Sequence, residues 1–169
     1  MSGLERLNRM LSADARAELL RCCGSSRWAD GMVRARPFRD AEHLFSEAAW
    51  LWEQTGPEDW HEAFKHHPRI GDVSQLRAKF ASTATWSSQE QGGVVGADEA
   101  VLQGLADGNA EYERRFGFIF LVCATGKSAA EMLGLLRARL DNPLDEELRI
   151  AAGEQAKITR IRLEKLLAP

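Results

Sequence analysis

One short stretch of the sequence joins residue types that could transfer a proton. His66 and His67 stand directly before Pro68, and an arginine, an isoleucine, a glycine and an aspartate follow at 69–72. Histidine has the side-chain pKa closest to neutrality, so it can donate or accept a proton during a reaction. A residue before proline is pushed out of the right-handed helical region, which predicts that a helix ends here and leaves His67 at a chain reversal. His67 is therefore a candidate for acid–base chemistry, and a His-Pro pair is also ordinary punctuation at a helix end.

Two further charged groups could converge on this histidine. Glu90 closes the sequence Ser87-Ser88-Gln89-Glu90, which has the spacing of a capping box, so its carboxylate could bond the backbone amide of Ser87 or join a binding site. Arg162 stands four residues before Leu166 in an apolar stripe and could anchor an anion or extend its head into water, as could Arg160. Spacing alone favours the cap for Glu90 and the solvated position for Arg162.

Other chemistries find less support in the spacing. His61-Glu62 lacks the second histidine of a zinc-protease helix, and the adjacent histidines at 66 and 67 do not share a helix face. No Gly-x-Ser-x-Gly motif is present, and Cys123 stands in an apolar run where a buried, inert thiol is expected. Gly117 and Gly126 are too sparse for a phosphate-binding loop. We therefore expect no metal site and no nucleotide site.

The composition predicts one domain over residues 1–169. A chain of this length can bury about 70% of the surface that its unfolded form exposes. The net charge of −3 comes from 22 basic and 25 acidic residues mixed along the chain, which argues against nucleic-acid binding. No apolar run is long enough to span a membrane, the first residues lack a signal-peptide pattern, and the adjacent Cys22 and Cys23 indicate a reducing compartment. We expect a cytoplasmic protein with no membrane partner.

Helical patterns dominate the chain and must position the candidate groups. Apolar residues at helical spacing, with caps and glycine or proline stops, predict helices over 4–11, 13–23, 41–54, 57–66, 75–81, 98–116, 129–140 and 143–167. Gly24 is well placed to end the second helix and to open a loop to Pro37. Only residues 118–124 have the composition of a strand, and a single strand cannot form a sheet. The sequence therefore predicts an all-α, single-domain helical bundle with one short extended apolar segment.

Five segments in order resemble the family of 2-oxo-4-hydroxy-4-carboxy-5-ureidoimidazoline (OHCU) decarboxylases, which act in the breakdown of urate to allantoin. No single segment is specific, but together they span nearly the whole chain. They are Arg36-Pro37-Phe38, His67-Pro68-Arg69-Ile70-Gly71, Ser87-Ser88-Gln89-Glu90-Gln91, Arg115-Phe116-Gly117-Phe118-Ile119-Phe120 and Ile158-Thr159-Arg160-Ile161-Arg162-Leu163. The resemblance implies an all-α homodimeric enzyme without metal or organic cofactor that converts a small ureidoimidazoline to (S)-allantoin and CO₂.

The resemblance also implies roles for particular residues. His67 would be the catalytic acid, whose proton fixes the product as one enantiomer, and Glu90 would contact the ureido group or hold the charge of the histidine. Arg162 would face the substrate anion. The other substrate-binding positions would be Pro68, Ser87, Ser88, Gln89 and Gln91, together with the backbone of Phe120, Leu121, Val122, Cys123 and Ala124.

The sequence departs from the family pattern at two places. Ile119 stands between two phenylalanines where many members have proline, which puts the presentation of the 120–124 backbone in doubt. The run Arg69-Ile70-Gly71-Asp72 differs from the Asp-Leu-Ala-Gly form of other members and is similar to a form common in bacterial ones.

Two other functions stay open. A non-catalytic helical interaction module could bind a partner through surface aromatics such as Trp28 and Trp86, with Trp50, Trp52 and Trp60 in the core or in a dimer interface. The same acid–base site could instead hydrolyse 5-hydroxyisourate, one step earlier in urate breakdown. That reaction is usually served by a β-rich family, so the helical patterns count against it.

Overall fold

The computed structural model describes residues 1–69, 72–78, 80 and 95–169, and all regular secondary structure within them is α-helical. The all-α prediction is therefore confirmed. The chain divides into two compact units, one formed by residues 1–67 with 148–169 and the other by residues 68–147. We call these unit 1 and unit 2.

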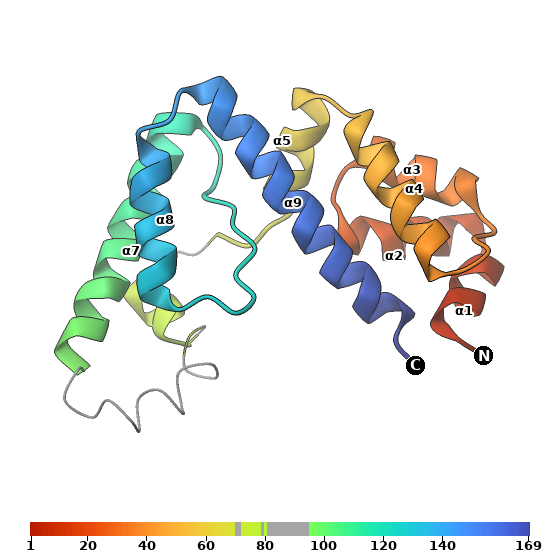
Figure 1. Cartoon of the computed structure of the whole chain (residues 1–169), viewed down its shortest axis with the longest axis horizontal. Helices are drawn as coiled ribbons and strands as arrows, with labels where there is room; N and C mark the ends of the chain where they lie inside the picture. Colours follow the sequence, from red (N-terminus) through yellow and green to blue (C-terminus); the bar gives the residue numbers. More distant parts are fainter. Residues whose placement is uncertain (70–71, 79, 81–94) are drawn as a thin grey trace. The chain divides into compact units, whose positions relative to one another are not determined.

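Unit 1 is a group of helices (Figure 1), and apolar side chains from these helices are buried between them. Its helices are α1 (Gly3–Arg9), α2 (Ser12–Cys22), α3 (Ser26–Ala35), α4 (Ala41–Glu53), α5 (Pro57–Lys65) and most of α9 (Leu144–Leu167). Two indole N–H groups tie helices together, since Trp28 Nε1 donates to the carbonyl of Ala48 at 3.0 Å and Trp52 Nε1 to that of Ala152 at 2.9 Å. Burial of such large side chains, each with its polar atom bonded, provides much of the stability of this unit.

Helix α3 corrects the predicted loop from Gly24 to Pro37. The Ser25 side chain accepts a hydrogen bond from the backbone N–H of Trp28 and caps the helix. Trp28 is only 1% exposed and Met32, four residues later, is fully buried. Gly24 does end α2, but the cap and this apolar pair start a new helix two residues later. Trp28 is therefore a core residue and not the surface aromatic that the interaction-module alternative requires.

Unit 2 is built on two parallel helices, α7 (Val95–Phe116) and α8 (Ala129–Leu140), which lie side by side (Figure 1). Two close contacts show that the helices run in the same direction. A Cβ added to Gly104 would lie 3.0 Å from Leu133, and one added to Gly108, one turn later, would lie 2.5 Å from Leu136. The contacts advance together along both helices. Residues 73–78 and the first residues of α9 complete the helical part of the unit.

The parallel arrangement explains the extended apolar segment. Two successive parallel helices need a return connection, and α8, with its 12 residues, is about 18 Å long at about 1.5 Å per residue. Residues 117–128 make this return without helix or strand, as predicted for 118–124. Gly117 and Gly126, with φ of 81° and 75°, form bends near its two ends, a backbone conformation that side chains other than glycine rarely adopt.

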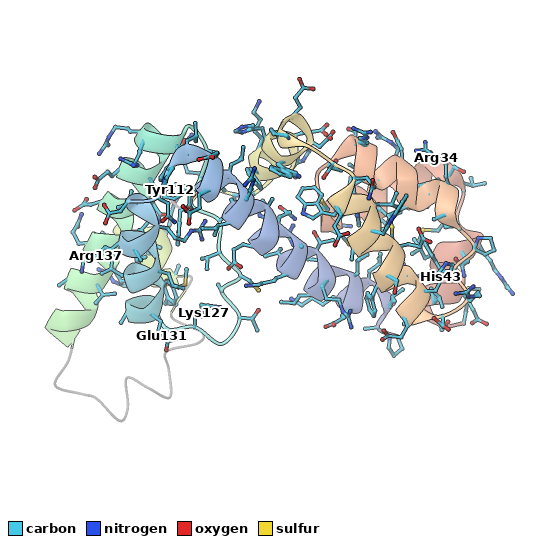
Figure 2. All side chains as sticks on the ribbon, turned by 45° about the horizontal axis from the view of Figure 1, so that its top comes forward. Arg34, His43, Tyr112, Lys127, Glu131 and Arg137 are labelled. Atoms are coloured by element: carbon cyan, nitrogen blue, oxygen red, sulfur yellow. The ribbon has the colours of Figure 1, made fainter. Side chains whose placement is uncertain are left out.

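The return connection packs its aromatic side chains against Tyr112. The Tyr112 ring lies 4.6 Å from that of Phe116, 5.7 Å from Phe118 and 5.3 Å from Phe120, measured between centroids. Tyr112 is fully buried, and Figure 2 shows it near the carboxyl-terminal end of α7. This cluster fixes the first half of the connection on the body of unit 2.

Candidate functional site

His67 stands just beyond the end of α5. The helix ends at Lys65 with His66 as its C-cap, and the N–H of His67 donates to the carbonyl of Phe64 at 3.2 Å. Pro68 has no N–H and prevents a further turn. His67 is half-buried at this chain reversal, and the predicted placement is confirmed.

A chain of polar side chains holds the His67 ring from within unit 1. His67 Nε2 lies 2.6 Å from Gln155 Oε1, and Gln155 Nε2 donates to Thr159 Oγ1 at 3.0 Å. Thr159 Oγ1 in turn donates to the carbonyl of Cys22 at 3.4 Å. Gln155 is fully buried and Thr159 is 7% exposed. These hydrogen bonds were not predicted, and the available signal was two polar residues, Gln155 and Thr159, four positions apart on one face of α9.

The surroundings of His67 favour its neutral form. Burial lowers the pKa of its imidazole, and the electrostatic effects of Arg162 and His66 lower it further, while the hydrogen bond to Gln155 raises it. Burial also raises the pKa of the Cys22 and Cys23 thiols to about 11, against the lowering effect of Arg162. The thiols therefore stay neutral at physiological pH, and the charge of Arg162 acts on both thiols and on the histidine.

The two arginines near the end of α9 occupy different environments. Arg162 is half-buried and donates to the carbonyl of Arg21 at 3.4 Å. Arg160 is exposed, pairs with Glu164 at 2.9 Å and lies over the Phe45 ring with its guanidinium carbon 3.7 Å from the centroid. Arg162 is thus the arginine beside His67, whereas Arg160 is committed to a surface cluster.

The two adjacent histidines, His66 and His67, also occupy different environments. His66 is exposed, and its ring lies against the backbone of Gly24, where an added Cβ would meet His66 Cδ2 at 2.5 Å. Of two adjacent imidazoles, only His67 combines partial burial with a hydrogen-bonded ring nitrogen held by α9. A proton-transferring group needs this kind of fixed ring orientation.

Known proteins are similar to this chain over most of its length. The family model for OHCU decarboxylase matches residues 8–164, which include His67, Gln155 and Arg162. The chain belongs to the OHCU decarboxylase family. A 2-oxo-4-hydroxy-4-carboxy-5-ureidoimidazoline decarboxylase of Amia calva is 34% identical over 132 residues, 78% of this chain and 75% of that protein.

Longer proteins also contain a segment similar to this family member. The uric acid degradation bifunctional protein TTL of Arabidopsis thaliana is 38% identical over 149 residues, which are 87% of this chain and 45% of that protein. The chain thus spans less than half of the bifunctional protein. A solved structure of an OHCU decarboxylase in the presence of (S)-allantoin matches with a TM-score of 0.71 and 38% identity, over 89% of this chain and 96% of that one.

The segment that the family resemblance assigns to substrate binding, Phe120 to Ala124, lies in the return connection of unit 2. Two side chains hold its carbonyls: Arg139 Nη1 donates to Leu121 O at 2.7 Å and Lys127 Nζ donates to Cys123 O at 2.8 Å. Lys127 lies just before the start of α8, close to Glu131 of its first turn (Figure 2). Two carbonyls of the segment, those of Leu121 and Cys123, are thus held by side chains of unit 2.

A buried charge network behind this segment went unpredicted. Arg139 Nε donates to Glu147 Oε1 at 2.5 Å, and the Tyr112 hydroxyl donates to the same oxygen at 2.5 Å. Asn142 Nδ2 donates to Glu147 Oε2 at 3.0 Å, and the Arg139 guanidinium lies over Phe120. Burial and the bond to Glu147 raise the pKa of Tyr112. The available signal was the position of Arg139, three residues after the buried Leu136 on the apolar face of α8.

The remaining predicted residues divide between exposed positions and positions that are not described. Pro68 is exposed at the start of unit 2. Ser87, Ser88, Gln89, Glu90 and Gln91, and also Trp86, lie outside the described residues. Their roles therefore stay predictions.

Metal ligands do not gather in the part of the chain that the structure describes, where no group of three or more histidine, cysteine, aspartate or glutamate side chains is placed to hold an ion. The three cysteines, Cys22, Cys23 and Cys123, are buried. Within the same described residues, no helix is both long enough and apolar enough to cross a membrane.

Proposed function

We propose that this chain converts 2-oxo-4-hydroxy-4-carboxy-5-ureidoimidazoline to (S)-allantoin and CO₂, with His67 as the proton donor. The observation that carries the proposal is the His67 ring, half-buried after α5 and held at Nε2 by Gln155. In a member of the OHCU decarboxylase family, a fixed imidazole beside Arg162 is suited to meet an anionic substrate.

The chemistry needs only what these residues can supply. When the bond between the carboxylate and its carbon breaks, CO₂ leaves and the electron pair remains on that carbon. The imidazoline system can delocalise this pair. Protonated His67 then gives one proton to one face of that carbon, and the neutral ring regains a proton from water. Arg162 would hold the substrate anion and stabilise charge during the reaction. Glu90 would accept hydrogen bonds from the ureido group, with Ser87, Ser88, Gln89, Gln91, Pro68 and the 120–124 backbone completing the site.

The proposed assembly follows the family. We expect a homodimer in the cytoplasm in which the whole chain acts as one domain, with the small ureidoimidazoline as its only required partner. Trp50 is 56% exposed on α4 and offers an apolar contact for a second copy. The buried Trp28 gives the alternative interaction module no support.

The direct test follows the formation of optically active product. Freshly generated substrate, which decays in water, should yield a circular dichroism signal of one enantiomer of allantoin much faster with the protein than in buffer alone. A signal that grows no faster than in buffer, from protein that is folded by its far-ultraviolet spectrum, would overturn the proposal.

The assignment of Arg162 makes a separate prediction. Arg162→Met should raise KM roughly 10-fold to 100-fold, because a charge-assisted hydrogen bond to the substrate is worth about 1.5–3 kcal/mol. It should also raise the pKa of His67, because a nearby positive charge is lost. Arg160→Met is the matched control and should change both quantities little, since that side chain is exposed and paired with Glu164. Equal effects of the two changes on KM and on the pKa of His67 would show that Arg162 does not bind the substrate.

A further inference from the structure

The hydrogen bonds that connect His67, Gln155 and Thr159 to the backbone have a fixed donor-to-acceptor direction, because the last group in the series is a carbonyl that can only accept a hydrogen bond. The carbonyl of Cys22, in the last residue of α2, receives the hydroxyl hydrogen of Thr159. A hydroxyl has one hydrogen to donate and lone pairs with which to accept. Once that hydrogen is used on Cys22, Thr159 Oγ1 must accept from Gln155.

The acceptor role of Thr159 orients the amide of Gln155. Only Gln155 Nε2 can donate to Thr159 Oγ1, at 3.0 Å, so the carbonyl oxygen Oε1 faces His67. The reversed amide would place two acceptors against each other at Thr159 or would remove the hydroxyl from Cys22. Such orientations are assigned from the hydrogen-bond network, and here a backbone carbonyl decides it.

The oriented amide decides which nitrogen of His67 carries a hydrogen. Gln155 Oε1 has no hydrogen, and it lies 2.6 Å from His67 Nε2, so this nitrogen must be the donor. We infer that Gln155 and Thr159 are positioning residues that keep His67 in the Nε2–H tautomer, so that the proton given to the substrate is the one on Nδ1. Burial of Gln155 and Thr159 strengthens this preference, because the wrong tautomer would leave the buried Gln155 Oε1 facing a second acceptor.

The tautomer matters for the reaction cycle. Protonated His67 carries hydrogens on both nitrogens, and the Nε2–H bond to Gln155 stays in place while the Nδ1 proton moves to the substrate carbon. The neutral ring that remains is already the Nε2–H form, and Nδ1 can take the next proton from water. The ring therefore neither rotates nor exchanges its inner hydrogen during turnover. This inference rests on the proposed role of His67 as proton donor, but the tautomer itself is a property of the protein without substrate.

The test measures the tautomer directly in the full chain. Two-bond ¹H–¹⁵N correlation spectra of ¹⁵N-labelled protein, recorded above the pKa of His67 and assigned by comparison with His67→Asn, distinguish a protonated from an unprotonated ring nitrogen. We expect Nε2 to be protonated and Nδ1 to be bare. The opposite pattern in the wild-type protein would overturn the inference, even if the protein is an active decarboxylase. Conversely, the expected pattern in an inactive protein would leave the tautomer standing and reject the proposed function.

Variants of the chain separate positioning from mere packing. Thr159→Val removes the hydroxyl at nearly constant volume and should produce a mixture of tautomers with kcat reduced by up to about 100-fold. Thr159→Ser keeps the hydroxyl and should restore the wild-type spectrum and most of kcat. A Thr159→Val protein with the wild-type tautomer and wild-type kcat would refute the positioning role of Thr159.

Gln155→Glu tests the positioning role through the pKa of His67, which should not change if Gln155 has only a packing role. A carboxylate at this position also accepts from Nε2–H, and its negative charge should raise the pKa of His67 by about 1 to 3 pH units. The change acts against the lowering of this pKa by burial and by the electrostatic effects of Arg162 on α9 and of His66. The ¹⁵N titration of His67 and the alkaline limb of kcat/KM should move together to higher pH. An unchanged titration midpoint would show that Gln155 does not face Nε2.

Discussion

Replacing His67 with asparagine should slow the enzymatic decarboxylation by about 100-fold to 10,000-fold, the range that a positioned general acid contributes. Asparagine has no titratable hydrogen, so the carbanion left after CO₂ departs would have to take its proton from water. The product should then lose optical purity, because water can reach either face of the carbon. The measurement is the circular dichroism progress curve with fresh substrate, which reports rate and enantiomer together.

The adjacent histidine provides the matched control for this change. His66→Asn alters an exposed imidazole one residue away, and its effect on kcat should stay within about two-fold, as for most surface substitutions. Thermal unfolding should show that His67→Asn costs about 1 kcal/mol, the usual value of one hydrogen bond, so loss of fold cannot explain loss of rate. Equal rates for the two variants would exclude His67 as the acid.

The pH dependence of the wild-type enzyme follows from the same group. A general acid must be protonated, so kcat/KM should fall as the pH rises through the pKa of His67 in the free protein. Burial and the electrostatic effects of Arg162 and His66 lower this pKa, so the fall should centre below about pH 6.5, the ordinary value for histidine. A fall centred above that value would contradict the environment described for the ring.

Local sequence rules predicted the elements whose causes are local. Pro68 after a helical pattern placed the end of α5 and with it His67, and the caps Asp40 and Ser128 mark the starts of α4 and α8 in the structure. The apolar run after Gly117 was predicted to be extended. Its physical reason, the return between two parallel helices, depends on tertiary packing and cannot be read from the run itself.

The failures of prediction have long-range or competing causes. Gly24 ends α2 and was interpreted as the start of a loop, so the Ser25 cap of α3 was missed. Trp28, which is buried, was therefore expected on the surface. The choice between Arg160 and Arg162 needed the contacts of α9 with Phe45 and with the end of α2. Gln155 and Thr159 are ordinary polar residues in a sequence, and only their burial beside His67 gives them a role.

The buried charge network of unit 2 gives the largest expected effect on stability. Arg139→Met should lower the free energy of unfolding by about 3–5 kcal/mol, because Glu147 is fully buried and would lose its cationic partner. The same change frees the carbonyl of Leu121 and removes the guanidinium from the Phe120 ring. The segment proposed to bind substrate should then be less well fixed, so KM should rise at temperatures where the variant is still folded. Denaturant unfolding and steady-state kinetics measure the two effects.

Arg137→Met is the matched control, because Arg137 lies two residues earlier on α8 and is exposed (Figure 2). It should change the free energy of unfolding by no more than about 0.5 kcal/mol. Adding Glu147→Gln to Arg139→Met should recover part of the lost stability, since the amide carries no uncompensated charge, its oxygen still accepts from Tyr112, and its NH₂ can donate to Asn142 Oδ1 after the Asn142 amide turns over. Recovery of stability without recovery of KM would show that Arg139 acts on the segment through its bond to Leu121. If Arg139→Met costs no more than Arg137→Met, the ion pair does not hold this part of the fold together.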